Sequence, residues 1–259
     1  MPDSHVLPST GVHNFRDYGG YPMAGGGRLV RGRLYRSGDL SHATDADLTL
    51  VAGLELTNVF DLRGSKEREK EPCRWPSGFK ASVFAAEGET TVAAPHVEAA
   101  ASAFDAAAAR RTLCERYASV PFRPVLVEVY RAYFHALNRG SITSLAYCTA
   151  GKDRTGVLVA LLHTAVGVHP DDMLEDYLLT NTVGDAEKRV AALRSDLQRR
   201  FGAQMTEEGI RVVTSVEPVF LESAFTAIRQ RYGTVNDYLE QVLGVTQAVR
   251  ERLSSNLAA

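Results

Sequence analysis

Residues Ser144 to Leu162 read SLAYCTAGKDRTGVLVALL, a stretch in which a short polar loop separates two apolar runs. The first run has the length and composition of a buried strand, and the second, residues 156–166, is long enough for a buried helix. Gly167 and Pro170 are typical of the end of this helix and the start of the next. A strand, a loop and a helix in this order predict an α/β fold, with the loop at the carboxyl end of the strand.

The length and composition of the chain are those of one globular domain. Its 259 residues are 45% hydrophobic, which is enough to bury a substantial core, and we interpret residues 1–259 as a single domain. The 29 Lys and Arg side chains nearly balance 31 Asp and Glu side chains, so the net charge is -2. This balance provides no global basic field for nucleic acid or an anionic membrane. Any anion must therefore be recognised locally.

The cysteines and the apolar runs bear on localisation. Cys73, Cys114 and Cys148 are few and widely spaced, which favours reduced thiols and a cytoplasmic protein. The first ten residues, MPDSHVLPST, lack the features of a Sec-type signal peptide, although export by another route would leave no such mark. The longest apolar run, residues 157–168, is too short to span a bilayer, so we expect no integral membrane association.

Apolar spacing and capping residues predict further elements along the chain. LELTNVFDLR is expected to be a buried strand that ends near residues 61–63, and the charged run SKEREKEP after it a solvated loop or helix start. Helices are predicted at residues 45–53, 124–137, 185–200, 217–231 and 235–243, with caps at Thr44, Ser215, Thr234 and Thr246. No internal repeat is present.

The composition shifts to alanine between Thr90 and Arg111. Alanine favours helix but buries little apolar surface, so the segment could form a helical flap or an exposed insertion without a role.

The loop after the predicted strand has the chemistry of an oxyanion site. Cys148 and Arg154 are separated by five residues, and a helix N-terminus, small loop residues and a guanidinium can together hold a tetrahedral dianion without a metal. The same charges favour a thiolate, which could attack phosphorus and form a phosphocysteine. Thr155 could then hydrogen-bond the leaving sulfur. The phosphate-binding candidates are Thr149, Ala150, Gly151, Lys152 and Thr155.

CTAGKDRTG resembles the signature loop of cysteine-dependent phosphatases, and in particular of the atypical bacterial tyrosine phosphatases of the protein tyrosine phosphatase B type. The resemblance continues in the same order through HNFRDYGG, RGRLYRSGDL, NVFDLR, LLTN and YGTVNDYLEQVLGV, over roughly residues 11–245. It implies a central, largely parallel sheet flanked by helices, with a helical lid at about residues 90–115. It also implies metal-independent hydrolysis of phosphotyrosine, with phosphoserine, phosphothreonine or phosphoinositides as further substrates.

The same resemblance assigns roles to three residues of the loop. It implies that Cys148 is the nucleophile, that Arg154 binds the phosphate and that Asp153 is a catalytic aspartate. One position departs from the family, because Tyr147 stands where the family usually has histidine before the nucleophile. This departure keeps open the alternative of a phosphate-binding pseudophosphatase with little turnover. Sulfur transfer by Cys148 is a second alternative, which the KDRT sequence disfavours.

The general acid has two candidates, Asp153 and Asp61. Asp153 lies in the loop beside Arg154, and Asp61 ends a predicted strand, where α/β folds place functional groups. Asp61 and Arg63 are two residues apart, so a structural ion pair is an equal interpretation of Asp61. The family resemblance favours Asp153.

Lys152 is one of only five lysines, beside 24 arginines. The phosphatase-and-tensin lipid phosphatases have a similar AGK loop, which implies a role for Lys152 in recognising the charge of a phosphoinositide. The alternative is a solvated lysine at the loop rim.

Other site types find no support in the sequence. The seven histidines form no HExxH motif or close cluster, so we expect no metal site and no cofactor. GKD lacks the Ser or Thr that follows lysine in a nucleotide-binding P-loop, and the earlier glycine position is Ala146. The sequence carries no signal of a particular oligomeric state.

Overall fold

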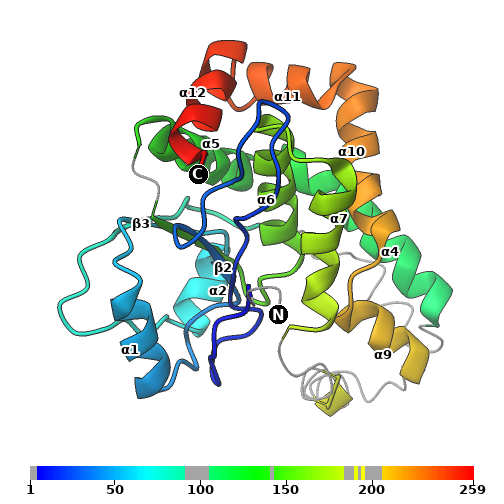
Figure 1. Cartoon of the computed structure of the whole chain (residues 1–259). Helices are drawn as coiled ribbons and strands as arrows, with labels where there is room; N and C mark the ends of the chain where they lie inside the picture. Colours follow the sequence, from blue (N-terminus) through cyan, green and yellow to red (C-terminus); the bar gives the residue numbers. More distant parts are fainter. Residues whose placement is uncertain (1–4, 91–104, 141–142, 184–189, 192–193, 196–205) are drawn as a thin grey trace.

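The computed structural model describes residues 5–90, 105–140, 143–183, 190–191, 194–195 and 206–259 (Figure 1). Its sheet has five strands in the order β1-β2-β5-β3-β4. The strands are β1 (Arg16–Asp17), β2 (Leu34–Ser37), β3 (Asn58–Asp61), β4 (Ser82–Phe84) and β5 (Ser144–Tyr147). β2, β5, β3 and β4 run parallel, and only β1 is antiparallel to its neighbour. The expected α/β fold with a largely parallel sheet is confirmed.

The central strand β5 sets the position of the predicted loop. Tyr147, its last residue, pairs with Ser37 of β2 on one side and with Asp61 of β3 on the other. Because these parallel strands end level, the segments that follow all three emerge at the same edge of the sheet. Ligand sites of α/β proteins form at this edge, next to a change in strand order.

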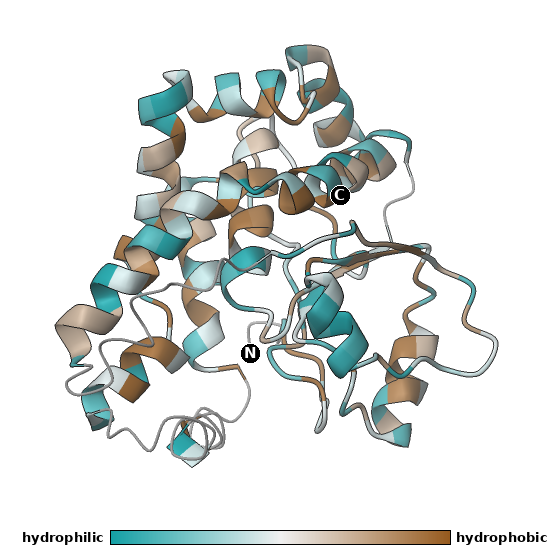
Figure 2. Ribbon diagram, turned by 180° about the vertical axis from the view of Figure 1, so that it is seen from behind, coloured by the Kyte–Doolittle hydropathy of each residue, from teal (hydrophilic) through white to brown (hydrophobic). Residues whose placement is uncertain are grey.

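Ten α-helices are described around the sheet. They are α1 (Asp45–Gly53), α2 (Ser65–Lys70), α4 (Ala106–Ser119), α5 (Pro124–Asn138), α6 (Asp153–Ala165), α7 (Pro170–Leu178), α9 (Glu207–Thr214), α10 (Pro218–Tyr232), α11 (Val235–Gln241) and α12 (Gln247–Leu257). The outer helices carry hydrophobic and hydrophilic residues in alternating bands, as expected of helices with one buried side (Figure 2). No described helix is long and apolar enough to cross a membrane.

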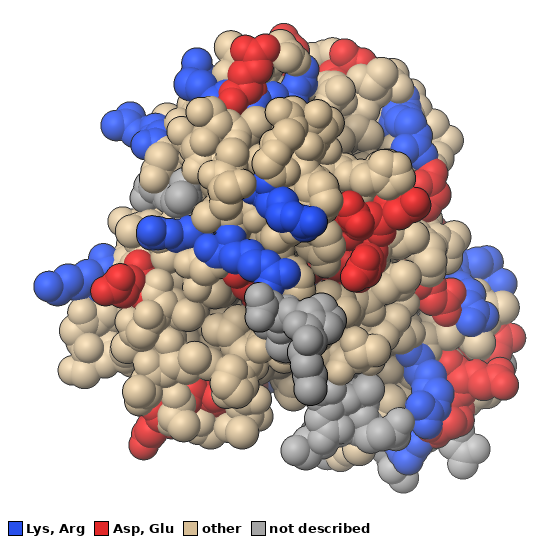
Figure 3. Space-filling view, in the orientation of Figure 1, with Lys and Arg blue, Asp and Glu red and all other residues tan. Residues whose placement is uncertain are grey.

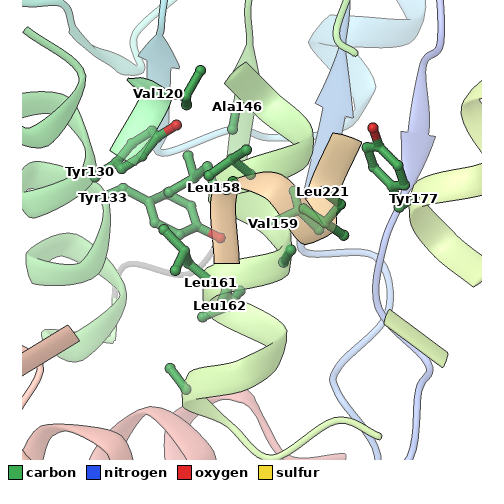
Figure 4. Packing of buried hydrophobic residues seen from close by; sticks show 14 of the residues in the cluster. Val120, Tyr130, Tyr133, Ala146, Leu158, Val159, Leu161, Leu162, Tyr177 and Leu221 are labelled. Atoms are coloured by element: carbon green, nitrogen blue, oxygen red, sulfur yellow. The ribbon is translucent and has the colours of Figure 1, made fainter. Parts of the chain in front are cut away.

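Helix α6 is the centre of the larger hydrophobic core. It lies between α5 and α7 (Figure 1), and ten of its 13 residues are buried. Leu158, Leu161 and Leu162 of this helix pack near Tyr130 and Tyr133 of α5 (Figure 4). A helix that is apolar on all sides cannot face water, which explains why the sequence shows a continuous apolar run here rather than helical spacing.

The two faces of the sheet carry separate cores. Phe60 and Ala146 belong to the larger core with α6, whereas Val59 and Leu145 belong to a smaller core that includes Val51 of α1. Successive side chains of a strand point to opposite faces. Tyr147 therefore points into the smaller core, and Cys148, after the strand, belongs to the larger one.

The Ala-rich segment lies partly outside the described residues, which resume at Asp105. The part that is described forms α4, whose Ala109, Leu113 and Tyr117 are buried against the larger core. The lid stays a prediction for residues 91–104. The predicted helix at residues 185–200 also lies mostly outside the described residues.

Acidic and basic side chains both occur on the face shown in Figure 3, in keeping with the nearly balanced total charge.

We expect Leu161→Ala to lower the free energy of unfolding by about 2–5 kcal/mol, because it removes buried methyl groups and leaves a cavity beside α6. Urea unfolding measures this loss. Val219→Ala on α10 is the control, since Val219 is exposed and its truncation should change stability by less than about 0.5 kcal/mol. Equal losses in the two variants would contradict the central place of α6.

Candidate active site

The predicted loop connects the end of β5 to the start of α6. Cys148 is only 2% exposed and follows Tyr147 directly, and α6 begins at Asp153. The partial positive charge at the N-terminus of α6 is therefore directed at the loop, where it favours anions.

Gly151 fixes the path of the loop. Its φ of 64° lies in the left-handed region, and a Cβ atom here would stand 2.3 Å from the carbonyl carbon of Ser37. Its carbonyl oxygen accepts hydrogen bonds from Asn14 Nδ2 at 2.7 Å and from Arg36 Nη2 at 3.0 Å. Only glycine fits this close approach between the loop and the end of β2.

Both of these donors belong to a buried ionic cluster. Asp176 of α7 binds Arg16 Nε at 3.0 Å and Arg36 Nη1 at 2.7 Å, and Arg16 also donates to the side chain of Asn14. Burial alone would raise the pKa of Asp176, but the charges of Arg16 and Arg36 outweigh it and hold that pKa well below the usual range. Asp176 therefore stays ionised and keeps both arginines in place.

The Arg154 guanidinium is held beside the loop by hydrogen bonds. Nη1 and Nη2 donate to the two carboxylate oxygens of Glu67 at 2.6 and 2.8 Å, and Nη1 also donates to Thr90 Oγ1 at 2.6 Å. Burial lowers the pKa of Arg154, but Glu67 and Cys148 raise it more, so its pKa lies above the ordinary value. The guanidinium is a permanent cation that already pairs with a forked oxyanion.

Glu67 is a site residue that the sequence did not reveal. Its run, SKEREKEP, is typical of a solvated segment, yet α2 carries Glu67 over the loop, where it also accepts from Thr149 Oγ1 at 2.5 Å and Gly64 N at 2.8 Å. Burial raises the pKa of Glu67, but its hydrogen bonds with Arg154 and the charge of Arg154 lower it to about 2.

Asp153 and Lys152 are bound to the helices beside the loop. Asp153 is 21% exposed, and its Oδ1 accepts from the Tyr117 hydroxyl of α4 at 2.5 Å. Lys152 Nζ lies 3.5 Å from the same oxygen and donates to the carbonyls of Val213 and Ser215 at 2.6 and 3.1 Å. Lys152 is buried at the carboxyl end of α9, so the alternative of a solvated lysine at the loop rim is wrong.

Asp61 lies on the other face of the sheet, beside the smaller core. It is 2% exposed, and it accepts from Arg63 Nη2 at 2.8 Å and Nε at 3.0 Å. The Tyr147 hydroxyl donates at 2.7 Å to Asp61 Oδ2, the same oxygen that accepts from Arg63 Nη2. Asp61 thus forms the structural ion pair that was the alternative interpretation, and Tyr147 links β5 to β3 rather than contacting the loop with its side chain.

Two buried hydroxyls lie close to the loop. Thr155 Oγ1 has no hydrogen-bond partner among the described residues, which leaves it able to bind a ligand or the cysteine sulfur. Tyr130 of α5 donates to the carbonyl of Arg154 at 2.9 Å and fixes the first turn of α6. Ala150, between Thr149 and Gly151, completes the loop. Within the described ranges no three His, Cys, Asp or Glu side chains form a group that could hold a metal ion.

We expect the Arg154–Glu67 pair to make stability depend on acid pH. Because the pKa of Glu67 is lowered in the folded state, the stabilisation is present above its ordinary pKa of 4.5 and is lost as the pH falls towards about 2. Glu67→Gln should cost about 1–2 kcal/mol at pH 7, since the partial exposure of the pair screens it, and the difference from wild type should shrink below pH 4.5. Denaturant unfolding at several pH values measures this. Glu69→Gln, on the exposed side of α2, should have no such effect, and a pH-independent difference for Glu67→Gln would contradict the assignment.

Comparisons with known proteins agree with this geometry. A sequence model of the tyrosine phosphatase family matches residues 7–259. A Cupriavidus necator protein named "putative tyrosine-protein phosphatase" is 33% identical over 251 residues, which cover 94% of this chain and 86% of that protein. The triple specificity protein phosphatase PtpB of Mycobacterium tuberculosis is 30% identical, over 94% of this chain and 95% of its own length. The chain belongs to the tyrosine phosphatase family, whose activity is the hydrolysis of phosphotyrosine.

Proposed function

We propose that the protein hydrolyses phosphotyrosine through a phosphocysteine at Cys148, by a mechanism that requires no metal. The observation that carries the proposal is the placement of two residues. Cys148 lies in the loop that precedes α6, and Arg154 lies in the first turn of α6. Arg154 binds the phosphoryl oxygens, and the loop amides bind the rest of the dianion.

The reaction takes two steps. In the first, the Cys148 thiolate attacks phosphorus, the S–P bond forms, the P–O bond to tyrosine breaks and the leaving oxygen takes a proton from Asp153. In the second, Asp153 accepts a proton from water as the water oxygen attacks phosphorus, and the S–P bond breaks to release phosphate. We assign the hydrogen bond to the departing sulfur to Thr155 of α6, whose buried hydroxyl has no hydrogen-bond partner among the described residues.

Asp153 is the proposed acid, and the contacts of Asp61 support this choice. The Asp61 carboxylate is bound by Arg63 and Tyr147 on the opposite face of the sheet, whereas Asp153 directly precedes Arg154 and is partly exposed.

We also propose which phosphate monoesters the protein hydrolyses. The relative named a triple specificity phosphatase supports activity on phosphoserine and phosphothreonine beside phosphotyrosine, and the AGK loop supports phosphoinositides. Lys152 now lies against the carbonyls of Val213 and Ser215, so a phosphoinositide would have to draw it away from α9. We therefore propose phosphotyrosine as the main substrate.

Hydrolysis of p-nitrophenyl phosphate and of a phosphotyrosine peptide in EDTA tests the thiol mechanism. Wild type should turn over both substrates, and Cys148→Ser should lose at least a factor of about a thousand because the serine hydroxyl is not ionised at neutral pH. Cys114→Ser on α4 is the matched control and should keep full activity. Binding of vanadate by a wild type with no turnover would instead establish the pseudophosphatase.

Leaving-group dependence tests the acid. Asp153→Asn should reduce kcat/KM, which reports the first step, for phenyl phosphate by about a hundredfold and for p-nitrophenyl phosphate far less, because a good leaving group needs little protonation. Asp61→Asn should affect the two substrates alike, through stability. The reverse pattern would transfer the role to Asp61.

A further inference from the structure

Two buried tyrosines form a chain of hydrogen bonds that ends on Asp153. Tyr177 of α7 donates to the hydroxyl of Tyr117 at 2.7 Å, and Tyr117 donates to Asp153 Oδ1 at 2.5 Å. Each hydroxyl has a single hydrogen to donate, so the direction of the chain is fixed once the carboxylate accepts. Helix α4 thus contacts Asp153 directly, and α7 is linked to Asp153 through Tyr117.

The position of Tyr117 is set by packing. The residue is fully buried in α4, its ring lies 6.4 Å from that of Tyr177 in an edge-to-face arrangement, and its ring centroid lies 5.7 Å from that of Phe220 in α10. Burial, with the nearby charge of Asp153, raises the pKa of Tyr117 well above its ordinary value. Tyr117 therefore stays protonated at neutral pH, where it can donate its hydrogen bond.

The two carboxylate oxygens of Asp153 differ in their contacts. Among the described residues, both the Tyr117 hydroxyl and Lys152 Nζ lie at Oδ1, at 2.5 and 3.5 Å. Arg154, the next residue, adds a positive charge, and Glu217, before α10, adds a negative charge that acts on Tyr177 less strongly than that of Asp153 itself. When Asp153 is protonated, the proton therefore belongs on Oδ2, the oxygen that these donors leave open.

We propose that Tyr117, supported by Tyr177, is a positioning residue that holds Asp153 by Oδ1 and so directs the proton on Oδ2 to the leaving oxygen. This inference rests on the proposed role of Asp153 as general acid. As the proton leaves Oδ2 and the P–O bond breaks, negative charge appears on the carboxylate, and the hydrogen bond from Tyr117 becomes charge-assisted and stronger. In the second step the same bond holds the carboxylate while Oδ2 takes a proton from the attacking water.

The test compares Tyr117→Phe with a matched control elsewhere in the core. Tyr18 and Tyr133 form a second pair of buried hydroxyls at 2.5 Å, with no described contact to Asp153, so Tyr133→Phe removes an equivalent hydroxyl without touching the loop. The readout is the pH profile of kcat/KM, together with kcat, for phenyl phosphate and p-nitrophenyl phosphate.

The hydrogen bond from Tyr117 favours the charged form of the carboxylate, so its loss in Tyr117→Phe should move the basic limb of the profile upward by about one pH unit. It should also lower kcat/KM for phenyl phosphate about tenfold and for p-nitrophenyl phosphate by less than about threefold, because only the poor leaving group depends on a well-placed proton in the first step. Tyr133→Phe should change neither the limb nor the ratio of the two rates.

Tyr177→Phe provides a second test in case the Tyr117→Phe variant does not fold. It keeps the donation from Tyr117 to Asp153 and removes only its support, so it should give a smaller upward shift of the same limb. An unshifted limb in a folded Tyr117→Phe protein, with equal losses on both substrates, would overturn the inference. If Tyr117→Phe does not fold, an unshifted limb in Tyr177→Phe does the same.

Asp153→Asn separates this inference from the proposed function. Should that variant lose activity equally on both substrates, Asp153 is not the acid and both proposals fail. Should it lose activity mainly on phenyl phosphate while Tyr117→Phe behaves like Tyr133→Phe, the acid stands and only the role of Tyr117 is overturned.

Discussion

The site depends on one buried carboxylate, that of Asp176. It lies between Arg16 and Arg36, and without it two guanidinium groups would be buried beside each other with no counter-charge. Arg36 and Asn14 hold the carbonyl of Gly151, so the carboxylate on α7 sets the path of a loop that follows β5. Two arginines and one aspartate leave a net positive charge behind the loop, which favours a bound anion.

Successive side chains along β5 and β3 point to opposite faces of the sheet, so the proposed nucleophile and the structural contacts of Tyr147 and Asp61 lie on different faces. Tyr147, in the position where the family usually has histidine, points into the smaller core and binds Asp61, while the next residue, Cys148, belongs to the core around α6. The side chain of Tyr147 therefore connects β5 to β3 through its hydrogen bond to Asp61. The electrostatic environment of Cys148 is formed instead by Arg154 and the N-terminus of α6.

The features predicted from sequence are the local ones. The helix at Asp45–Gly53 forms with its capping box at Thr44, and Thr234 and Thr246 cap as expected, because each cap involves residues only a few positions apart. Ser215 was wrong as a cap: it ends α9, and Glu217 is the N-cap of α10. The sequence did not predict the roles of three residues whose partners are far away along the chain, Glu67, Tyr117 and Asp176. Glu67 also lies in a charged run and Tyr117 in an alanine-rich helix, and such segments are usually solvated.

The claim that unites these features is that the loop makes Cys148 a nucleophile towards phosphorus. Rapid acid quenching of the protein during turnover of a phosphotyrosine peptide, followed by mass spectrometry of its cysteine-containing fragments, tests that claim most directly. We expect phosphate on the fragment that contains Cys148, and none on those with Cys73 or Cys114. Steady release of phosphate with no phosphorylated Cys148 fragment at any quench time would contradict it.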